Sequence, residues 1–164
     1  MLYTLTTKCN NKCLCCIFDK KTRQHNLDKP LPTNSSTLNE PRIITGGEPT
    51  IANSFFEVMK DANSGKENIL LLTNSRAFSN KKFFDNFLKL RMDKTRLRIA
   101  TALYSYNEKG HDSITRTPKS FEQTVAGLKR LHDEGYKLEI RIIITKQNYR
   151  DLPKIARYIM NNFP

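Results

Sequence analysis

The sequence predicts one α/β domain built on a mainly parallel sheet, and three observations lead to this fold class. Five short apolar runs have the composition of buried strands, and stretches with helical period separate the later ones. The chain has 164 residues, of which 38% are hydrophobic, so it is long enough for one core and too short for two comfortable domains. Residues suited to ligand binding directly follow the first four strands. Because the carboxyl ends of parallel strands meet at one edge of a sheet, we expect a single site there.

The predicted strands are short runs rich in leucine or β-branched residues. Amphipathic stretches alternate with the later strands, which favours a parallel sheet with helical crossovers. The five runs are Leu2–Thr6, Arg42–Thr45, Ile69–Thr73, Leu97–Leu103 and Leu138–Thr145.

Two amphipathic helices are expected in the first half of the chain. "SFFEVMKDA" begins at Ser54, and Ser54 with Glu57 has the spacing of a capping box. Residues 80–91 place several phenylalanines and leucines on one broad apolar face. The first crossover differs, because "TRQHNLDKPLPTNSSTLNEP" at residues 22–41 has three prolines and little apolar period. We therefore expect its helix to be degenerate.

Two further helices are expected in the second half. "SFEQTVAGLKRLHDEG" begins at Ser120, where Gln123 completes a second capping box, and Gly135 is a natural stop. Asp151 is expected to cap "LPKIARYIMNN", whose Pro153 is tolerated in the first turn.

The charge and the hydropathy exclude some classes of protein. With 28 basic and 16 acidic residues the net charge is +12, which favours anionic partners such as nucleic acid, a phosphate-bearing ligand or an acidic peptide. No recognition motif accompanies the charge, so nucleic-acid binding is not expected. There is no run of 18 apolar residues and no secretory signal, and we expect a cytoplasmic protein without a membrane span.

All four cysteines lie within "CNNKCLCC" at residues 9–16. In a reducing compartment such thiols are metal ligands or catalysts more often than disulfides. The spacing C-x3-C-x2-C of Cys9, Cys13 and Cys16 suits zinc or an iron–sulfur cluster. A closed zinc site needs a fourth ligand, for which Cys15 and His25 are the weak candidates. Three ligands better fit a [4Fe–4S] cluster that leaves one iron open.

"CNNKCLCC" followed by "GGEPT" resembles the radical S-adenosylmethionine (radical SAM) superfamily. The segments "LTNS", "HDSITRTPKSFEQTVAGLKRL" and "LEIRIIITKQN" agree, so that the resemblance runs from Thr4 to about Asn161. Within the superfamily, "ITGGEPT", "NSRAFSN" and "KQNYRDLPKIARYI" look most similar to the maturases of His-Xaa-Ser peptide systems.

The resemblance implies a partial TIM-type barrel as the fold. Five βα units are visible and the family's sixth strand is missing, so residues 1–164 are expected to form a radical SAM core domain truncated at its carboxyl end. It implies a [4Fe–4S] cluster and S-adenosylmethionine as cofactors, and a reducing electron donor. A partner chain or a missing carboxyl-terminal segment is a further expected partner.

The resemblance also implies roles for individual residues. The cluster ligands are Cys9, Cys13 and Cys16, and the cofactor's ammonium is received by Gly46, Gly47 and Glu48, with Pro49 fixing the turn. Asn74 and Ser105, at strand ends, are either contacts to the methionyl or ribose part or ordinary turn caps. Arg141, or Arg116, is a candidate partner of the cofactor carboxylate, since a guanidinium matches a carboxylate bidentately. His111 and Asp112 resemble the family's common "HD" and are expected to be structural or to lie on the cofactor side.

The expected activity is cleavage of S-adenosylmethionine to a 5′-deoxyadenosyl radical that abstracts hydrogen from a ribosomally made peptide. A radical RNA-modifying enzyme is the alternative within the class, supported only by the net charge. A non-catalytic zinc or iron–sulfur module with a basic partner-binding surface is the alternative outside it.

Overall fold

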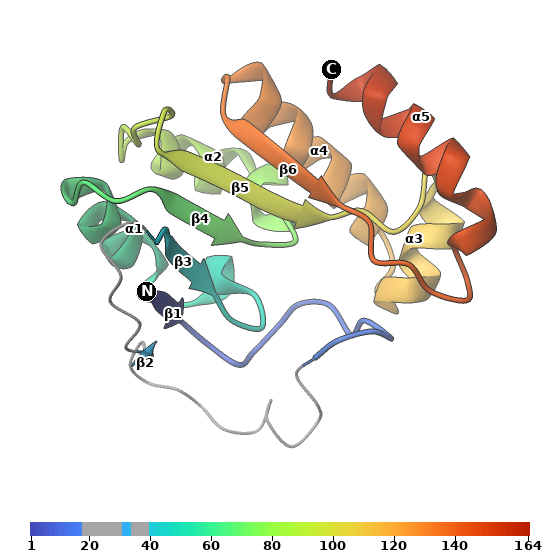
Figure 1. The fold of residues 1–164 in the computed structure, drawn as a ribbon, viewed down its shortest axis with the longest axis horizontal. Helices are drawn as coiled ribbons and strands as arrows, with labels where there is room; N and C mark the ends of the chain where they lie inside the picture. Colours follow the sequence, from blue (N-terminus) through green and yellow to red (C-terminus); the bar gives the residue numbers. More distant parts are fainter. Residues whose placement is uncertain (18–30, 34–39) are drawn as a thin grey trace.

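Five parallel strands alternate with helices, as the sequence predicts (Figure 1). The structure is a computed structural model that describes residues 1–17, 31–33 and 40–164. Its sheet has the order β2-β1-β3-β4-β5-β6, in which β1 and β3 to β6 run parallel and β2 pairs antiparallel with β1. The strands are β1 (Leu2–Thr4), β2 (Leu31–Thr33), β3 (Arg42–Thr45), β4 (Ile69–Leu72), β5 (Leu97–Ala102) and β6 (Lys137–Arg141). The result is an open, partial α/β barrel.

Helices α1, α2 and α4 pack against one face of the sheet (Figure 1). In the described ranges, short 3-10 segments join the longer elements: η2 (Pro49–Ile51), η3 (Arg76–Ser79) and η4 (Tyr149–Asp151). The α-helices are α1 (Phe55–Ser64), α2 (Lys81–Leu88), α3 (Glu108–Thr115), α4 (Ser120–Asp133) and α5 (Leu152–Asn162). Helix α3 was not predicted, because "EKGHDSIT" contains glycine, serine and aspartate, which disfavour helix interiors, and has little apolar period.

Side-chain alternation along the strands separates a face that the helices cover from one that they leave uncovered. Ile44, Leu71 and Ile99 are opposite one another in register and fully buried beneath the helices. A cluster of phenylalanines from α1, η3 and α2 fills the space over them, with Phe78 edge-on to Phe87 at 5.0 Å between ring centroids. Burying one such side chain contributes about 1.5–3 kcal/mol, so this side supplies the core. The opposite face is left for the site.

The helix caps differ from the predicted ones in three places. Ser54 makes no capping hydrogen bond, and Asp151 makes none either. Ser120 is the first residue of α4 rather than its cap, and the cap is the Asp112 carboxylate, which accepts from the Phe121 N–H at 2.8 Å and from the Ser120 hydroxyl at 2.7 Å. Gly135 does end α4, at φ +75°, as predicted.

The last strand stops at Arg141, four residues earlier than predicted. Asn148 turns the chain away, because its side-chain amide donates to the Ile143 and Tyr104 carbonyls and its side-chain oxygen accepts the Thr145 N–H. The short edge strand β2 was not predicted. Most of the first crossover, with His25, lies outside the described residues. Across the described ranges, every helix is too short or too polar to cross a membrane.

His111 on α3 is a buried histidine with a structural role. Its Nδ1 accepts the Tyr104 N–H at 3.2 Å, and its ring packs between the rings of Tyr104 and Phe121. Burial lowers the pKa of His111 from 6.5 to about 4, although the neighbouring Asp112 opposes the change. The histidine therefore joins α3 to the end of β5 in its neutral form.

This burial predicts an acid-sensitive fold. Between pH 6.5 and about 4 the unfolded chain binds a proton at this histidine and the folded chain does not, so stability is lost as pH falls through this window. The loss amounts to about 3 kcal/mol. His111→Gln, which keeps an acceptor for Tyr104, should be less stable at pH 7.5 but should show a flatter decline between pH 7 and pH 4.5. Urea unfolding of both proteins across this range measures the difference, and parallel declines would contradict the assignment.

Candidate active site

A pocket of about 270 Å³ opens at the carboxyl edge of the sheet. It is bounded by the loop after β1, the turn after β3 and the ends of β4, β5 and β6. Its floor is the face of the sheet that the helices leave uncovered, where the side chains are small or apolar. The floor residues are Leu72, Ala100 and Ala102, and the walls are formed by all four cysteines with Gly46, Gly47, Glu48, Asn74, Tyr104 and Arg141.

The cysteine loop is fixed by backbone hydrogen bonds to the end of α3. The Lys12 N–H donates to the Thr115 carbonyl and the Leu14 N–H to the Ile114 carbonyl, both at 2.9 Å. The last carbonyls of a helix have no partner within it, so the loop satisfies groups that would otherwise need water. Cys13 lies between the two anchored residues. The unpredicted helix α3 therefore determines where the cysteines lie.

Arg76 holds the same loop from another side. Its Nη1 donates to the Asn10 carbonyl and to the Asn11 side-chain oxygen, both at 2.6 Å. Its Nε donates to the Gln123 side chain on α4 at 2.8 Å. The loop is thus joined to two helices and to the end of β4.

The Gly46–Glu48 turn touches the chain that leaves β1. The Gly47 N–H donates to the Thr6 carbonyl at 2.7 Å, and the Glu48 N–H donates to the Lys8 carbonyl at 2.8 Å. A Cβ at Gly46, whose φ is +154°, would lie 2.5 Å from the Thr6 oxygen, and one at Gly47 would collide with the Lys8 oxygen. The glycines are therefore required for contact between two segments of this chain, in addition to any approach by a ligand.

Glu48 is a buried carboxylate, 1% exposed. Oε1 accepts from the Thr50 N–H, the Thr50 hydroxyl and the Thr73 hydroxyl, and Oε2 accepts from the Asn74 N–H at 2.7 Å. Burial raises the pKa of Glu48 and these donors oppose the rise. Among the described residues no cationic side chain lies within ion-pair distance of it. Its charge is therefore available to a cationic ligand.

The four thiols are half-buried and reduced. The Cys9 sulfur accepts the Asn11 N–H at 3.3 Å. Burial raises the pKa of Cys13, and a hydrogen bond from the Tyr104 hydroxyl partly offsets this. In the described ranges, no three His, Cys, Asp or Glu side chains are grouped closely enough to hold a metal ion. The cysteines share a pocket, but their sulfurs are not preassembled as a metal site.

The residues present nevertheless fit an iron–sulfur cluster with an amino-acid-bearing cofactor. Soft thiols line the same pocket as a buried carboxylate that has no cationic partner in the described chain, so donors for iron and for an ammonium group lie together. Metal ligands are commonly drawn into place by the metal bonds themselves. Cluster assembly then requires the sulfurs to move closer together within the pocket that they line.

Other predicted site residues divide into two groups. Asn74 and Arg141 line the pocket, with the Asn74 amide bonded to Asn10 and the Arg141 guanidinium bonded to Glu139 at 2.7 Å. Arg141 is exposed. Three residues do not line it: Pro49 starts η2, Ser105 packs against Gly110 of α3, and Arg116 follows α3 on the surface.

Sequence reasoning missed Tyr104 and Arg76. Tyr104 lies one residue before the chosen Ser105, and its ring enters the pocket beside Cys13 and Cys15. The prediction chose Ser105 at this strand end, but Ser105 packs against Gly110 of α3, and it is Tyr104 that lines the pocket. No sequence signal marked Arg76, because its partners are mostly backbone and amide oxygens of a distant loop.

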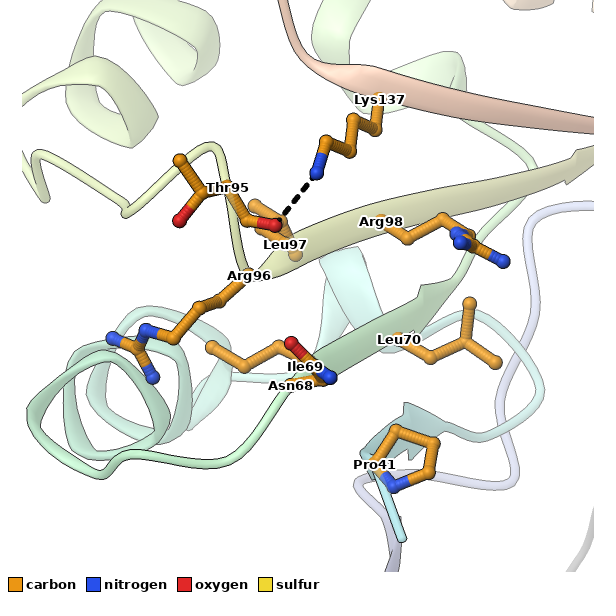
Figure 2. Close-up of a pocket in the computed structure, with 9 residues that line it drawn as sticks. All are labelled: Pro41, Asn68, Ile69, Leu70, Thr95, Arg96, Leu97, Arg98 and Lys137. Atoms are coloured by element: carbon orange, nitrogen blue, oxygen red, sulfur yellow. Dashed lines mark hydrogen bonds between the residues drawn. The ribbon is translucent and has the colours of Figure 1, made fainter. Parts of the chain in front are cut away.

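A second pocket, of about 330 Å³, lies at the opposite end of the strands (Figure 2). Its residues come from the starts of β4, β5 and β6 and include Arg96 and Lys137. Lys137 donates to the Thr95 carbonyl at 2.8 Å, the dashed line in Figure 2, and Arg96 is bonded to Asp93. Within the part of the chain that the structure describes, no thiol, histidine or carboxylate lines it. It therefore offers none of the chemistry found at the carboxyl edge.

Comparison with known proteins gives sequence relatives and structural neighbours. Fe-coproporphyrin III synthase of Methanosarcina barkeri is 24% identical over 162 residues, which cover 94% of this chain and 39% of that protein. Pre-heme d1 synthase of Dinoroseobacter shibae is 24% identical over 168 residues, with 96% and 39% covered. The chain thus spans well under half the length of these relatives.

Two solved structures share the fold. Streptococcus suis SuiB bound to its precursor peptide SuiA has a TM-score of 0.70 at 16% identity, covering 98% of this chain and 36% of SuiB. Native anSMEcpe with bound AdoMet and a peptide has a TM-score of 0.72 at 15% identity, covering 98% and 47%. At these identities the likeness establishes the fold alone.

The family model described as the radical SAM superfamily matches residues 3–159. Enzymes of this family use a [4Fe–4S] cluster and S-adenosylmethionine. The partial barrel, the cysteine loop and the Gly46–Glu48 turn at one sheet edge agree with this match. This chain belongs to the radical SAM superfamily.

Proposed function

We propose that residues 1–164 form the catalytic core of a radical SAM enzyme, in which Cys9, Cys13 and Cys16 bind a [4Fe–4S] cluster. The observation that carries the proposal is the shared pocket, in which the thiols face a buried carboxylate without a cationic partner among the described residues. When bound, the cluster supplies an electron that cleaves S-adenosylmethionine, and the resulting 5′-deoxyadenosyl radical abstracts hydrogen from the substrate.

The chain's own contribution is binding and orientation of the cofactor. Glu48 is the proposed acceptor for the cofactor ammonium, through Oε2, which has the Asn74 N–H as its donor. An opposite charge in this buried position compensates the desolvation of the carboxylate. Asn74 and Arg141 are the proposed partners of the cofactor's carboxylate or ribose, because both line the same pocket. Arg141 must exchange its bond to Glu139 to do so.

A ribosomally made peptide is the substrate class that we propose. The segments that look similar to peptide maturases support it, and the pocket opens at the sheet edge where a chain segment has access. SuiB and anSMEcpe are known with peptides bound, and the present fold is the same as theirs. Only the net charge of +12 favours RNA instead.

Four single-cysteine variants test the ligand assignment. After anaerobic reconstitution, Cys9→Ala, Cys13→Ala and Cys16→Ala should each lose the cluster, because a trio of thiolates cannot spare a ligand. Cys15→Ala is the matched control, since it removes a thiol from the same pocket, and it should retain about four irons per chain. Iron analysis and the visible absorption of the cluster provide the measurement.

Two outcomes contradict this assignment. One is loss of iron in Cys15→Ala with retention in any of the other three variants. The other is a colourless wild-type protein that holds one tightly bound zinc, which would instead support the non-catalytic metal module.

Glu48→Gln tests the ammonium contact. A hydrogen bond to a charged group contributes about 1.5–3 kcal/mol, so the variant should bind S-adenosylmethionine about tenfold to a hundredfold more weakly. The pKa of Glu48 is raised from 4.5, and only the ionised form attracts the ammonium, so wild-type affinity should increase as pH rises through that pKa. The variant should lack this dependence.

Equilibrium binding to the reconstituted protein at several pH values gives both quantities. Glu57→Gln makes the same change on the exposed side of α1 and should behave as wild type. If Glu48→Gln and Glu57→Gln bound the cofactor with equal affinity, Glu48 would not be part of the binding site.

Isotope transfer tests the peptide proposal. A deuterated peptide encoded beside this gene, incubated with the reduced enzyme, should transfer deuterium into 5′-deoxyadenosine. Mass spectrometry of the nucleoside detects it. If every neighbouring peptide left 5′-deoxyadenosine unlabelled and deuterated RNA labelled it, RNA would replace the peptide as the proposed substrate class.

A further inference from the structure

Tyr104 is a buried tyrosine in the candidate active site to which the proposed function gives no role. It follows β5 and is 7% exposed. It lines the pocket together with Cys13 and Cys15, and its hydroxyl is hydrogen-bonded to both of their sulfurs. A buried hydroxyl costs free energy unless it has a hydrogen-bond partner. The two sulfurs therefore make a tyrosine acceptable at this position.

The backbone of Tyr104 is fixed on both sides of its side chain. Its N–H donates to His111 Nδ1 at 3.2 Å, and its carbonyl accepts from the Asn148 side-chain amide at 3.0 Å. Its ring packs against the His111 imidazole, with 5.4 Å between the ring centroids. The position of the hydroxyl is thus set by α3 and by the turn after β6, in addition to β5.

Cys13 is held by the same helix. The residues on either side of it donate their backbone N–H groups to carbonyls in the last turn of α3, both at 2.9 Å. His111, which holds Tyr104, also belongs to α3. The hydroxyl and the sulfur are therefore both fixed relative to one helix, and the contact between them is built into the fold.

The ligand assignment makes the two sulfurs different acceptors. A cysteine binds metal as its thiolate, so Cys13 is ionised as a cluster ligand, whereas Cys15 keeps its proton. A thiol sulfur is a weak acceptor, and a hydrogen bond to an ionised group is about twice as strong as a neutral one. The single hydrogen of the Tyr104 hydroxyl should therefore go to Cys13 when iron is bound.

We propose that Tyr104 is a positioning residue that acts through Cys13, because its hydroxyl donates to the ligand thiolate and thereby raises the reduction potential of the cluster. This inference rests on the proposed radical SAM function. Reduction by one electron from an external reductant makes the ligand sulfurs more negative, so a donor stabilises the reduced state more than the oxidised one. The O–H bond stays intact and no proton is transferred.

Tyr104→Phe tests the inference, because it removes the hydroxyl and keeps the ring and both backbone hydrogen bonds. The reconstituted variant should still hold about four irons per chain. At a fixed potential, its ratio of reduced to oxidised cluster should be about fivefold to tenfold lower than in the wild type. This change equals a potential about 40–60 mV more negative, at about 59 mV per tenfold for one electron. An anaerobic redox titration followed by electron paramagnetic resonance measures it.

Two control variants separate this effect from the loss of a hydroxyl or of a thiol in general. Tyr136 is another buried tyrosine, 5% exposed, and it precedes β6 at the opposite end of the sheet. Tyr136→Phe should keep the wild-type potential. Cys15→Ala removes the competing sulfur from the same pocket, so its potential should equal or slightly exceed that of the wild type.

A second change at position 104 predicts a shift of the opposite sign. Fluorine on a phenol ring makes the hydroxyl a stronger donor, so 3-fluorotyrosine at this position should raise the potential above the wild-type value. A role of Tyr104 in packing alone would give no such pair of opposite shifts. This variant also provides the test if Tyr104→Phe holds less iron.

The outcomes distinguish this inference from the proposed function. A cluster whose potential is the same in the wild type, in Tyr104→Phe and with 3-fluorotyrosine overturns the role of the hydroxyl and leaves the enzymatic proposal standing. A negative shift in Cys15→Ala as large as that in Tyr104→Phe also overturns it, because the hydroxyl would then act through Cys15. A wild-type chain that assembles no cluster overturns the proposed function, and this inference with it.

Discussion

The geometry of the whole site depends on close backbone contact between the chain leaving β1 and the Gly46–Glu48 turn. Two hydrogen bonds join them, and any side chain at Gly46 or Gly47 would push the segments apart. Parallel pairing of β1 with β3 brings both segments to the same edge of the sheet. The contact then sets the distance from the cysteines to Glu48, which no single element determines alone.

Glu48 links this backbone contact to the proposed binding of the cofactor. A buried carboxylate destabilises the fold unless its oxygens find donors or a counter-charge. Thr50, Thr73 and Asn74 supply donors from the turn and from the end of β4, so the same carboxylate also joins two strand ends. The Glu48 carboxylate still has no positively charged partner among the described residues, and a cationic ligand would supply one. Structure and proposed binding thus use one residue, and its replacement tests both.

Much of this arrangement could be predicted from the sequence, because strand periodicity and the order of elements determine which residues share an edge. The cysteine loop and the Gly46–Glu48 turn follow successive parallel strands, and they do line one pocket. Helix α3 and the Asp112 cap could not be predicted, since both depend on tertiary contacts that override weak local propensity. The same holds for Tyr104 and for the exposure of Arg141, which follow from where β5 and β6 end.

The anchoring of the cysteine loop bears on how a cluster could assemble there. Lys12 and Leu14 are bonded to α3, and Lys8 and Asn10 are bonded to Glu48 and Arg76, so the backbone is held on both sides of Cys13 and on both sides of Cys9. Cys16 follows these anchors, and its N–H donates to the Cys13 carbonyl at 3.4 Å. The described sulfurs are not already grouped as a metal site, so assembly must bring them together by side-chain rotation and by adjustment of the chain around Cys16. Most of the loop is therefore fixed by the fold before a cluster binds.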